Sequence, residues 1–227
     1  MKKAATLSVL LLLLILSFTS FAQTTRFKLG VNMSTMTVKD NDYNYTDELN
    51  YKYKPGLYAG FLHEFKYINP VSIETGIAFS MKGYKVKDDK QVNGKTATLK
   101  VSVNLYYIEL PLNLKISNNV EGVKFFFIAG PYIGAAFMGD VKAELTYDGK
   151  TEKEDKDITI GMDNDKDMKV FDFGFNFGFG LDFKDVQLSL NYSLGLSNVT
   201  YVSKNGYSTS NRLFTFTAGI PLRMFRY

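Results

Sequence analysis

The sequence predicts an all-β chain that closes into an eight-stranded antiparallel up-and-down transmembrane β-barrel. Three observations predict it: eight segments alternate apolar with small or polar residues, their connections are alternately short and long, and the chain opens on an export signal. The clearest segment is residues 171–183, FDFGFNFGFGLDF, where large apolar side chains fill every odd position. Successive side chains of a strand point to opposite faces, so one face here is hydrocarbon and the other is small or polar. A tilted strand that crosses a bilayer needs about 9–11 residues, which this segment supplies.

The N-terminus has the composition of a secretory signal peptide. Lys2 and Lys3 precede an unbroken aliphatic run over residues 9–16, and small residues stand at Ser20 and Ala22. We expect a signal peptide over residues 1–22, cleaved between Ala22 and Gln23, followed by one barrel domain over residues 23–227. The chain has no cysteine, which excludes disulfides and a cysteine-linked lipid anchor. Its nearly balanced charge gives no reason to expect nucleic acid as a partner.

The first four predicted strands are residues 27–34, 57–65, 71–82 and 106–116. The first alternates Phe27, Leu29 and Val31 with polar residues or glycine, and in the second His63 interrupts the apolar face. The third alternates residues such as Ile73 and Ile77 with serine, glutamate and glycine. The fourth has the most regular alternation of the four, and its apolar face comprises Tyr106, Ile108, Leu110, Leu112, Leu114 and Ile116.

The last four predicted strands are residues 123–137, 171–183, 186–194 and 214–224. The fifth carries Phe125, Phe127 and Ile133 on one face and glycines or a lysine on the other. The seventh alternates leucines with serine and asparagine, and the eighth alternates Phe214 and Phe216 with threonine. Connections over residues 67–70, 117–122 and 184–185 are short, whereas those over 37–52, 86–100, 139–168 and 200–210 are long and polar. Outer-membrane barrels combine short periplasmic turns with longer external loops, so we expect both termini in the periplasm.

Closure into a barrel gives every backbone polar group a partner, as hydrocarbon requires. Large apolar side chains then face lipid, while glycine, serine, asparagine and charges face inward. Eight strands enclose a space that side chains can fill, so we expect no open pore. Charges in such a lumen need partners, which predicts an interior network of salt-bridged, hydrated pairs. The inward charges are Glu64, Glu74, Lys82, Glu109, Lys115, Asp172, Asp182 and Arg223, with Lys28 and Lys124.

Several phrases, in this order and spacing, resemble the PorT-like outer-membrane β-barrel family of Gram-negative bacteria. They begin with residues 28–32 (KLGVN), 107–112 (YIELPL) and 130–134 (GPYIG), and continue with residues 172–174 (DFG) and 195–199 (GLSNV). The likeness spans nearly the whole predicted domain. It implies an eight-stranded outer-membrane barrel and, for the namesake of the family, a part in type IX protein secretion.

Other chemistry-bearing residues favour structural roles. His63 is the only histidine and lies near the turn over residues 67–70, so we expect an interfacial residue rather than a catalytic one. Asp163, Asp165 and Asp167 alternate as cation ligands often do, but the glycine and distal glutamate of a calcium loop are missing, which favours a solvated loop. The tyrosines at 43, 45, 51 and 53 fit an interfacial girdle, with a contact surface as the alternative.

We therefore expect a non-enzymatic scaffold or interaction barrel without a cofactor or metal. Its expected partners are outer-membrane lipid and proteins of the envelope or secretion machinery. Three alternatives remain: an adhesion or ligand-binding barrel acting through its long loops, a barrel enzyme with its site at the rim, and a soluble periplasmic barrel with a lipid cavity. The single histidine disfavours the enzyme. The soluble barrel would crowd the phenylalanines of 171–183 inward and expose its aspartates.

Overall fold

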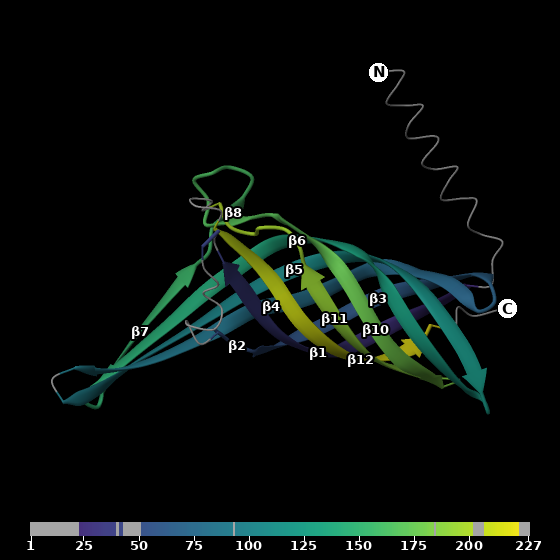
Figure 1. The fold of residues 1–227 in the computed structure, drawn as a ribbon, viewed down its shortest axis with the longest axis horizontal. Coiled ribbons are helices and arrows are strands. Elements are labelled where there is room, and N and C mark those ends of the chain that lie inside the picture. Colours follow the sequence, from purple (N-terminus) through teal and green to yellow (C-terminus); the bar gives the residue numbers. More distant parts are fainter. Residues whose placement is uncertain are drawn as a thin grey trace, which may run out of the picture.

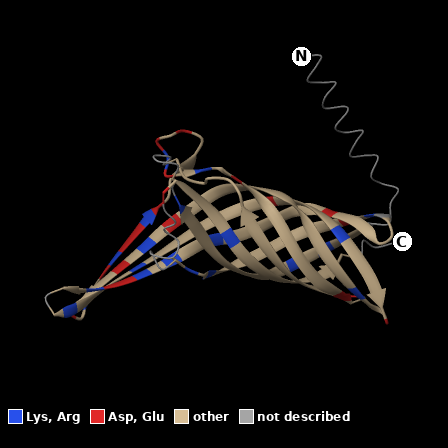
Figure 2. Ribbon diagram, viewed as in Figure 1, with Lys and Arg blue, Asp and Glu red and all other residues tan. Residues whose placement is uncertain are grey.

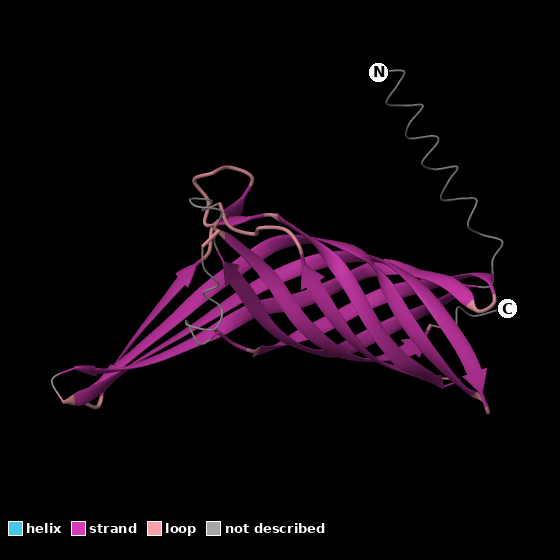
Figure 3. Ribbon diagram, in the orientation of Figure 1, coloured by secondary structure: helices cyan, strands magenta, loops and turns pink. Residues whose placement is uncertain are grey.

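A computed structural model describes residues 23–39, 41, 42, 51–92, 94–183, 185–201 and 207–222. Within these ranges every regular element is a β-strand (Figure 3). The described residues include no helix that is long and apolar enough to cross a membrane. The expected signal peptide and its cleavage site at Ala22 fall on or beside residues outside this range, as do Tyr43, Tyr45 and Arg223.

Eight of the described strands form a closed ring (Figure 1). Each pairs antiparallel with its two neighbours, and β12 returns to pair with β1, from Arg26–Pro221 to Lys39–Ser208. The all-β antiparallel barrel expected from the sequence is thus confirmed. In ring order the strands are β1 (Gln23–Lys39), β3 (Lys54–Ile68), β4 (Val71–Val92), β5 (Lys95–Val120), β6 (Val123–Tyr147), β10 (Phe171–Phe183), β11 (Val186–Gly195) and β12 (Ser208–Pro221).

One end of the barrel, which we call the short-turn end, carries the three short connections. A cis Asn69–Pro70 peptide joins β3 to β4. Glu121 and Gly122 join β5 to β6 with φ values of 50° and 89°. Two successive positive φ values give the turn whose twist matches a hairpin, and Gly122 adopts that conformation without steric cost. We call the opposite end the long-loop end.

The long connections were expected to be loops, and this was wrong for residues 86–100 and for much of 139–168. Strands β4, β5 and β6 continue past the barrel wall, and β7 (Lys150–Asp157) pairs with β6. Alternating valines, threonines and leucines favour extended chain in this region even though lysines are frequent. A tight turn at Asp148 and Gly149, both with positive φ, then folds β7 back on β6.

These extensions form a projecting four-stranded sheet, which we call the tongue: residues 85–102 and 140–157 (Figure 1). The neighbouring barrel strands do not accompany it, since β3 pairs with β4 only as far as Tyr58–Ser80 and β10 with β6 only as far as Phe171–Ala135. Short β2 (Tyr51–Lys52) pairs at its base. Its outer strand, β7, has the sequence KTEKEDKD, and charges on an edge strand oppose edge-to-edge aggregation.

The two faces of the barrel follow the alternation that the sequence predicts. On β10, Phe173, Phe177 and Phe179 are about half exposed on the outside, whereas Asp172 is fully buried on the inside. Two of the three glycines that alternate with the phenylalanines lie under aromatic rings of β6 that cover them from within. A side chain at Gly174 would overlap the ring of Tyr132, and one at Gly180 would overlap the ring of Phe126.

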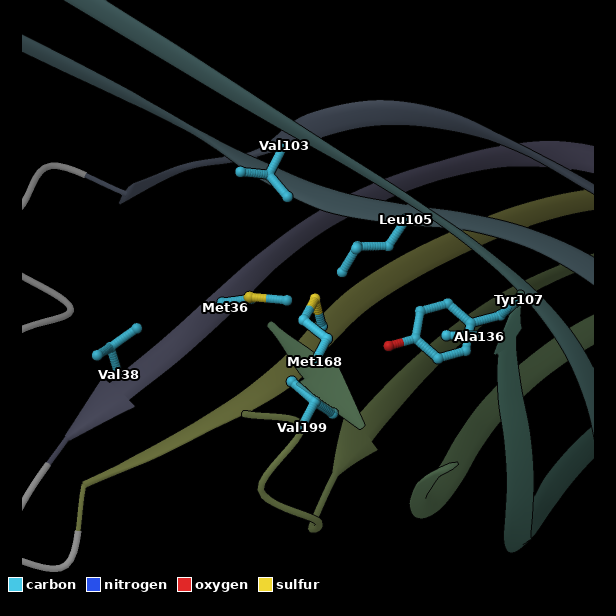
Figure 4. Packing of buried hydrophobic residues seen from close by; sticks show 8 residues of the cluster. All are labelled: Met36, Val38, Val103, Leu105, Tyr107, Ala136, Met168 and Val199. Atoms are coloured by element: carbon cyan, nitrogen blue, oxygen red, sulfur yellow. The ribbon is translucent and has the colours of Figure 1, made fainter. Parts of the chain in front are cut away.

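The interior at the long-loop end departs from the expectation that only small, polar and charged residues face inward. There an apolar cluster lines the barrel mouth (Figure 4). Met168 of β9 (Met168–Lys169), which pairs in parallel with β8 (Ile160–Gly161), and Val199 enter it from the connecting segments. The mouth is level with solvent rather than lipid, so an inward apolar face there removes hydrocarbon from water. The cluster comprises Met36, Val38, Val103, Leu105, Tyr107, Ala136, Met168 and Val199.

Candidate functional site

The interior below the apolar cluster is stacked in polar layers. Nearest the short-turn end, Glu64 of β3 accepts bonds from Arg26 Nη1 and Lys115 Nζ, each at 2.8 Å. The other guanidinium nitrogen of Arg26 donates to Asp182 of β10 at 2.8 Å. Arg26 therefore bridges two carboxylates from different walls of the barrel. Lys115 also lies 4.4 Å above the ring of Phe126, which shields it further from water.

Arg26 was missed by the sequence interpretation, which began the first strand at Phe27. β1 begins instead at Gln23, so Arg26 has the same inward parity as Lys28. Arg26 is only 8% exposed. The signal that could have found it is the alternation itself, carried one residue further toward the N-terminus.

The next layers combine one ion pair with neutral groups. Lys28 Nζ donates to Glu74 Oε2 at 2.9 Å, and both side chains are buried. Above them, the Asn32 amide donates to Ser80 Oγ at 3.0 Å and accepts from Thr215 Oγ1 at 2.8 Å. These groups come from three strands, β1, β4 and β12, so the layers tie those parts of the barrel wall to one another.

The most enclosed cation is Lys82, whose side chain is 0% exposed. Its Nζ lies 2.6 Å from Glu109 Oε1 and 2.8 Å from Asp172 Oδ2. The same nitrogen lies 4.6 Å from the ring centroids of both Tyr107 and Tyr132, a distance at which aromatic faces attract a cation.

Asp172 is held by several further donors. Asp172 Oδ2 accepts hydrogen bonds from the Asn211 amide at 2.9 Å and from the Tyr132 hydroxyl at 3.2 Å. Its Oδ1 accepts a hydrogen bond from Ser197 Oγ at 2.9 Å. A buried carboxylate is tolerated when hydrogen bonds and a counter-charge satisfy it, and this arrangement provides both. The structure thus brings eight of the predicted inward charges, Lys28 included, into contacts with one another or with Arg26.

Other residues singled out in the sequence lie elsewhere. His63 Nδ1 bonds to Thr25 Oγ1 at 2.7 Å, and its ring packs edge-on against Phe65 near the short-turn end. In the loop before β9, Asp165 pairs with Lys166 at 3.0 Å, while Asp167 accepts bonds from the backbone and hydroxyl of Thr159. Those hydrogen bonds lower the pKa of Asp167. Across the described ranges, no three His, Cys, Asp or Glu side chains gather as a metal site.

The tyrosines expected to form a girdle or a contact surface divide between two environments. Tyr53 is about half exposed, and its ring lies 6.1 Å from that of Phe214. Tyr51 instead packs against Tyr84 at 4.9 Å, beside a cavity of about 250 Å³ at the barrel mouth. Burial, with Tyr84 and Tyr207 nearby, raises the pKa of Tyr51 to about 12, so its phenol is neutral at physiological pH.

The tongue contributes a second polar feature, a groove of about 570 Å³ on one of its faces. The strands of the tongue carry closely spaced charges of both signs (Figure 2). Within the groove, however, cations outnumber anions, because six lysines face two carboxylates, those of Glu144 and Asp155. The lysines are Lys52, Lys85, Lys87, Lys100, Lys142 and Lys153.

Residues 21–201 match the family described as outer membrane protein beta-barrel domain. No curated protein sequence matches the chain.

Solved structures that resemble the chain include Ail, the attachment invasion locus protein of Yersinia pestis, with 13% identity over 88% of this chain and 98% of Ail, and a TM-score of 0.36. Neisserial surface protein A also has 13% identity, over 87% of this chain and 97% of its own, with a TM-score of 0.36. OprG of Pseudomonas aeruginosa has 9% identity over 89% of this chain and 97% of OprG, with a TM-score of 0.38.

The family match covers most of the chain, including seven of the eight ring strands. The closed ring, its apolar exterior and its paired interior charges are the properties that a bilayer demands of such a domain. The chain therefore belongs to the outer membrane protein beta-barrel domain family and is an outer-membrane β-barrel protein.

Proposed function

We propose that this barrel is a non-enzymatic interaction protein that anchors the tongue in the outer membrane and presents it to a partner. The observation that carries the proposal is the tongue itself. Four strands extend beyond the ring, and exposed side chains cover both its outer strand and its tip. A sheet held by continuous strands of the barrel is a rigid platform, unlike a loop joined at its ends alone.

The filled interior supports an anchoring role over a channel role. Salt-bridged layers occupy the lumen around Glu64, Glu74 and Lys82, and apolar side chains occupy the mouth. An eight-stranded barrel that contains these side chains has no room for a water-filled path as well. Purified protein in planar bilayers is expected to show no discrete conductance steps.

The proposed orientation places both termini and the short-turn end in the periplasm and the tongue outside the cell. It is supported by the even number of ring strands and by the rule that short turns are periplasmic. It also includes export by a signal peptide over residues 1–22. The variant Lys90→Cys, near the tip of the tongue, is expected to react with a membrane-impermeant maleimide on intact cells.

The test is complementation of a deletion strain. One strain receives the wild-type chain and another a tongue-shortened chain, in which residues 88–99 and 145–152 are each replaced by a two-residue Asn-Gly turn. Assembly of both barrels is checked by heat-dependent gel mobility of the outer-membrane fraction. The proposal expects an assembled but inactive short form, with envelope integrity or surface adhesion not restored. Full restoration by the short form contradicts it.

A second candidate role is PorT-like participation in protein secretion. It is favoured by the sequence phrases shared with that family, among them residues 107–112 and 195–199. The same deletion strain distinguishes it from surface adhesion. A secretion component predicts accumulation of export substrates in the periplasm, whereas a surface role predicts an unchanged set of secreted proteins.

A further inference from the structure

The lysine groove lies on the face of the tongue that continues the lipid-facing wall of the barrel. Cross-strand pairing sets Lys85 beside Ser102 and Ser102 beside Lys142, and one step further along it sets Lys87 beside Lys100. Lys85 and Lys87 have the same strand parity as Phe79 and Met81 of β4, which point outward from the ring. Lysines and outward apolar residues therefore share one continuous surface.

An aromatic group marks the upper border of the apolar belt on this surface. The rings of Phe79, Tyr106 and Phe137 lie within 6.3–6.5 Å of one another on three adjacent strands. Aromatic residues gather at the membrane interface, where one part of the side chain contacts the apolar region and the other contacts water. On β5 the outward apolar residues run from Ile116 up to Tyr106. Ten residues of tilted strand rise by about 25 Å, the height expected of the apolar band.

The lysines lie just above this border. The row of Met81, Tyr106 and Met138 is four residues below the row of Lys85, Ser102 and Lys142 on each strand. Four residues span about 13 Å along a strand, or about 10 Å of height at the usual tilt. Headgroup phosphates occupy this level of a bilayer.

The groove keeps an excess of positive charge after its internal pairs are counted. Glu144 pairs with Lys100 at 3.2 Å and Lys153 at 3.6 Å, and Asp155 lies 3.9 Å from Lys142. Outside the groove, Asp89 pairs with Lys87 at 2.7 Å. These side chains are exposed, so such pairs contribute little and can exchange for other anions.

We propose that the groove binds the phosphate groups of the outer-leaflet glycolipid, with the sugar backbone of that lipid lying against the tongue. Three features of the groove match this ligand: its sign of charge, its height above the aromatic border, and its opening toward the lipid side. The proposal deepens the interaction role and rests on its orientation. Bound lipid would hold the tongue at a defined angle to the membrane surface.

The experiment is native mass spectrometry of the full chain in detergent micelles, titrated with lipid A carrying two phosphates and with its dephosphorylated form. Wild-type protein is expected to bind the phosphorylated form at least about tenfold more tightly, because each lysine near an anionic headgroup contributes to attraction. This comparison needs no variant. Equal binding of the two lipids overturns the proposal.

Two triple variants locate the site. Lys85→Gln, Lys87→Gln and Lys142→Gln together remove three groove charges, and this variant is expected to lose the preference for phosphorylated lipid. The matched control, Lys90→Gln, Lys95→Gln and Lys150→Gln, removes three charges from the tongue tip and is expected to keep it. An equal loss in both variants shows a nonspecific charge effect and refutes the assignment.

Competition with inorganic phosphate separates a lipid site from a free-anion site. Millimolar phosphate is expected to leave the lipid complex largely intact, and full displacement refutes a lipid site. These measurements use detergent and are independent of cell orientation. A tongue that is unreactive to maleimide on intact cells would therefore contradict the proposed function while leaving phosphate binding by the groove testable by itself.

Discussion

Replacement of Lys82 by methionine is the sharpest test of the interior network. The lysine is fully buried between Glu109 and Asp172, at 2.6 and 2.8 Å. Methionine nearly matches its length and removes its charge, so two carboxylates would remain close together in the lumen without their shared cation. Breaking a buried ion pair by removal of one partner costs about 3–5 kcal/mol. That is a large fraction of a typical stability of about 5–15 kcal/mol.

The assay is equilibrium unfolding by urea in lipid vesicles, with the folded fraction measured from heat-dependent gel mobility. Lys82→Met should move the midpoint to clearly lower urea. The additional changes Glu109→Gln and Asp172→Asn should recover most of the loss, because they neutralise the two stranded carboxylates. Lys100→Met is the matched control, since the same substitution breaks only an exposed pair with Glu144, and no resolvable shift is expected.

Unfolding of Lys82→Met and Lys100→Met at the same urea concentration would refute a stabilising role for the Lys82 ion pairs. Equal midpoints would mean that lumen water solvates Glu109 and Asp172 as well as Lys82 does. The ion-pair layers would then fill the lumen without stabilising it.

Three further predictions follow from the exterior, the lumen wall and the loop before β9. Phe177→Lys, at the centre of β10, should destabilise the barrel in vesicles by about 2–4 kcal/mol, and Phe171→Lys, near the interface, should destabilise it by less. Equal destabilisation by the two variants would contradict the membrane position. Gly180→Val should cost about 1–3 kcal/mol because a side chain at this position overlaps both the Leu188 carbonyl oxygen and the Phe126 ring, and Phe126→Leu in the same chain should recover only the part that comes from the ring. Hydrogen bonds from Thr159 lower the pKa of Asp167 in the folded protein. The stability that the Asp167 carboxylate adds to this loop is therefore complete above the ordinary aspartate pKa of about 4, and it is lost as the pH falls through the lower folded pKa. Hydrogen exchange of residues 159–168 should therefore accelerate relative to β10 at acid pH in the wild type, but show no such pH step in Asp167→Asn.

Local pattern was sufficient for the barrel wall. Alternation has a period of two only in a strand, so residues 171–183 and 106–116 identified both the elements and the faces they turn to lipid. Turn chemistry and connection length then indicated antiparallel neighbours and an even ring. None of these inferences needs a contact between residues distant in the chain.

Local pattern was not sufficient to predict the tongue or the apolar cluster at the barrel mouth. In residues 86–100 the alternation is incomplete, because Asp88, Lys90 and Lys95 share a face with Val86, Ala97 and Leu99. Their lysine content also resembles that of a solvated loop. Pairing of β4 with β5, and of β5 with β6, makes these residues strands, because backbone hydrogen bonds between strands come from partners that local composition does not reveal. Likewise, Met36 and Val38 face inward beneath Met168 and Val199, which reach them from later parts of the chain.

Alternation along the chain was enough to identify a barrel, the residues on its outer face and most of the charges in its lumen, although not Arg26. The pairing of those charges became visible only in the folded ring. Arg26 reaches Asp182 across 156 residues, and Lys82 reaches Asp172 across 90. The register between neighbouring strands, accumulated around the ring, sets the height at which each inward side chain enters the lumen. That height is a property of the closed barrel and of no single strand, which is why the lumen network appears only once the ring is complete. The lysine groove likewise requires the pairing of β4 to β7, which brings its lysines together from different strands.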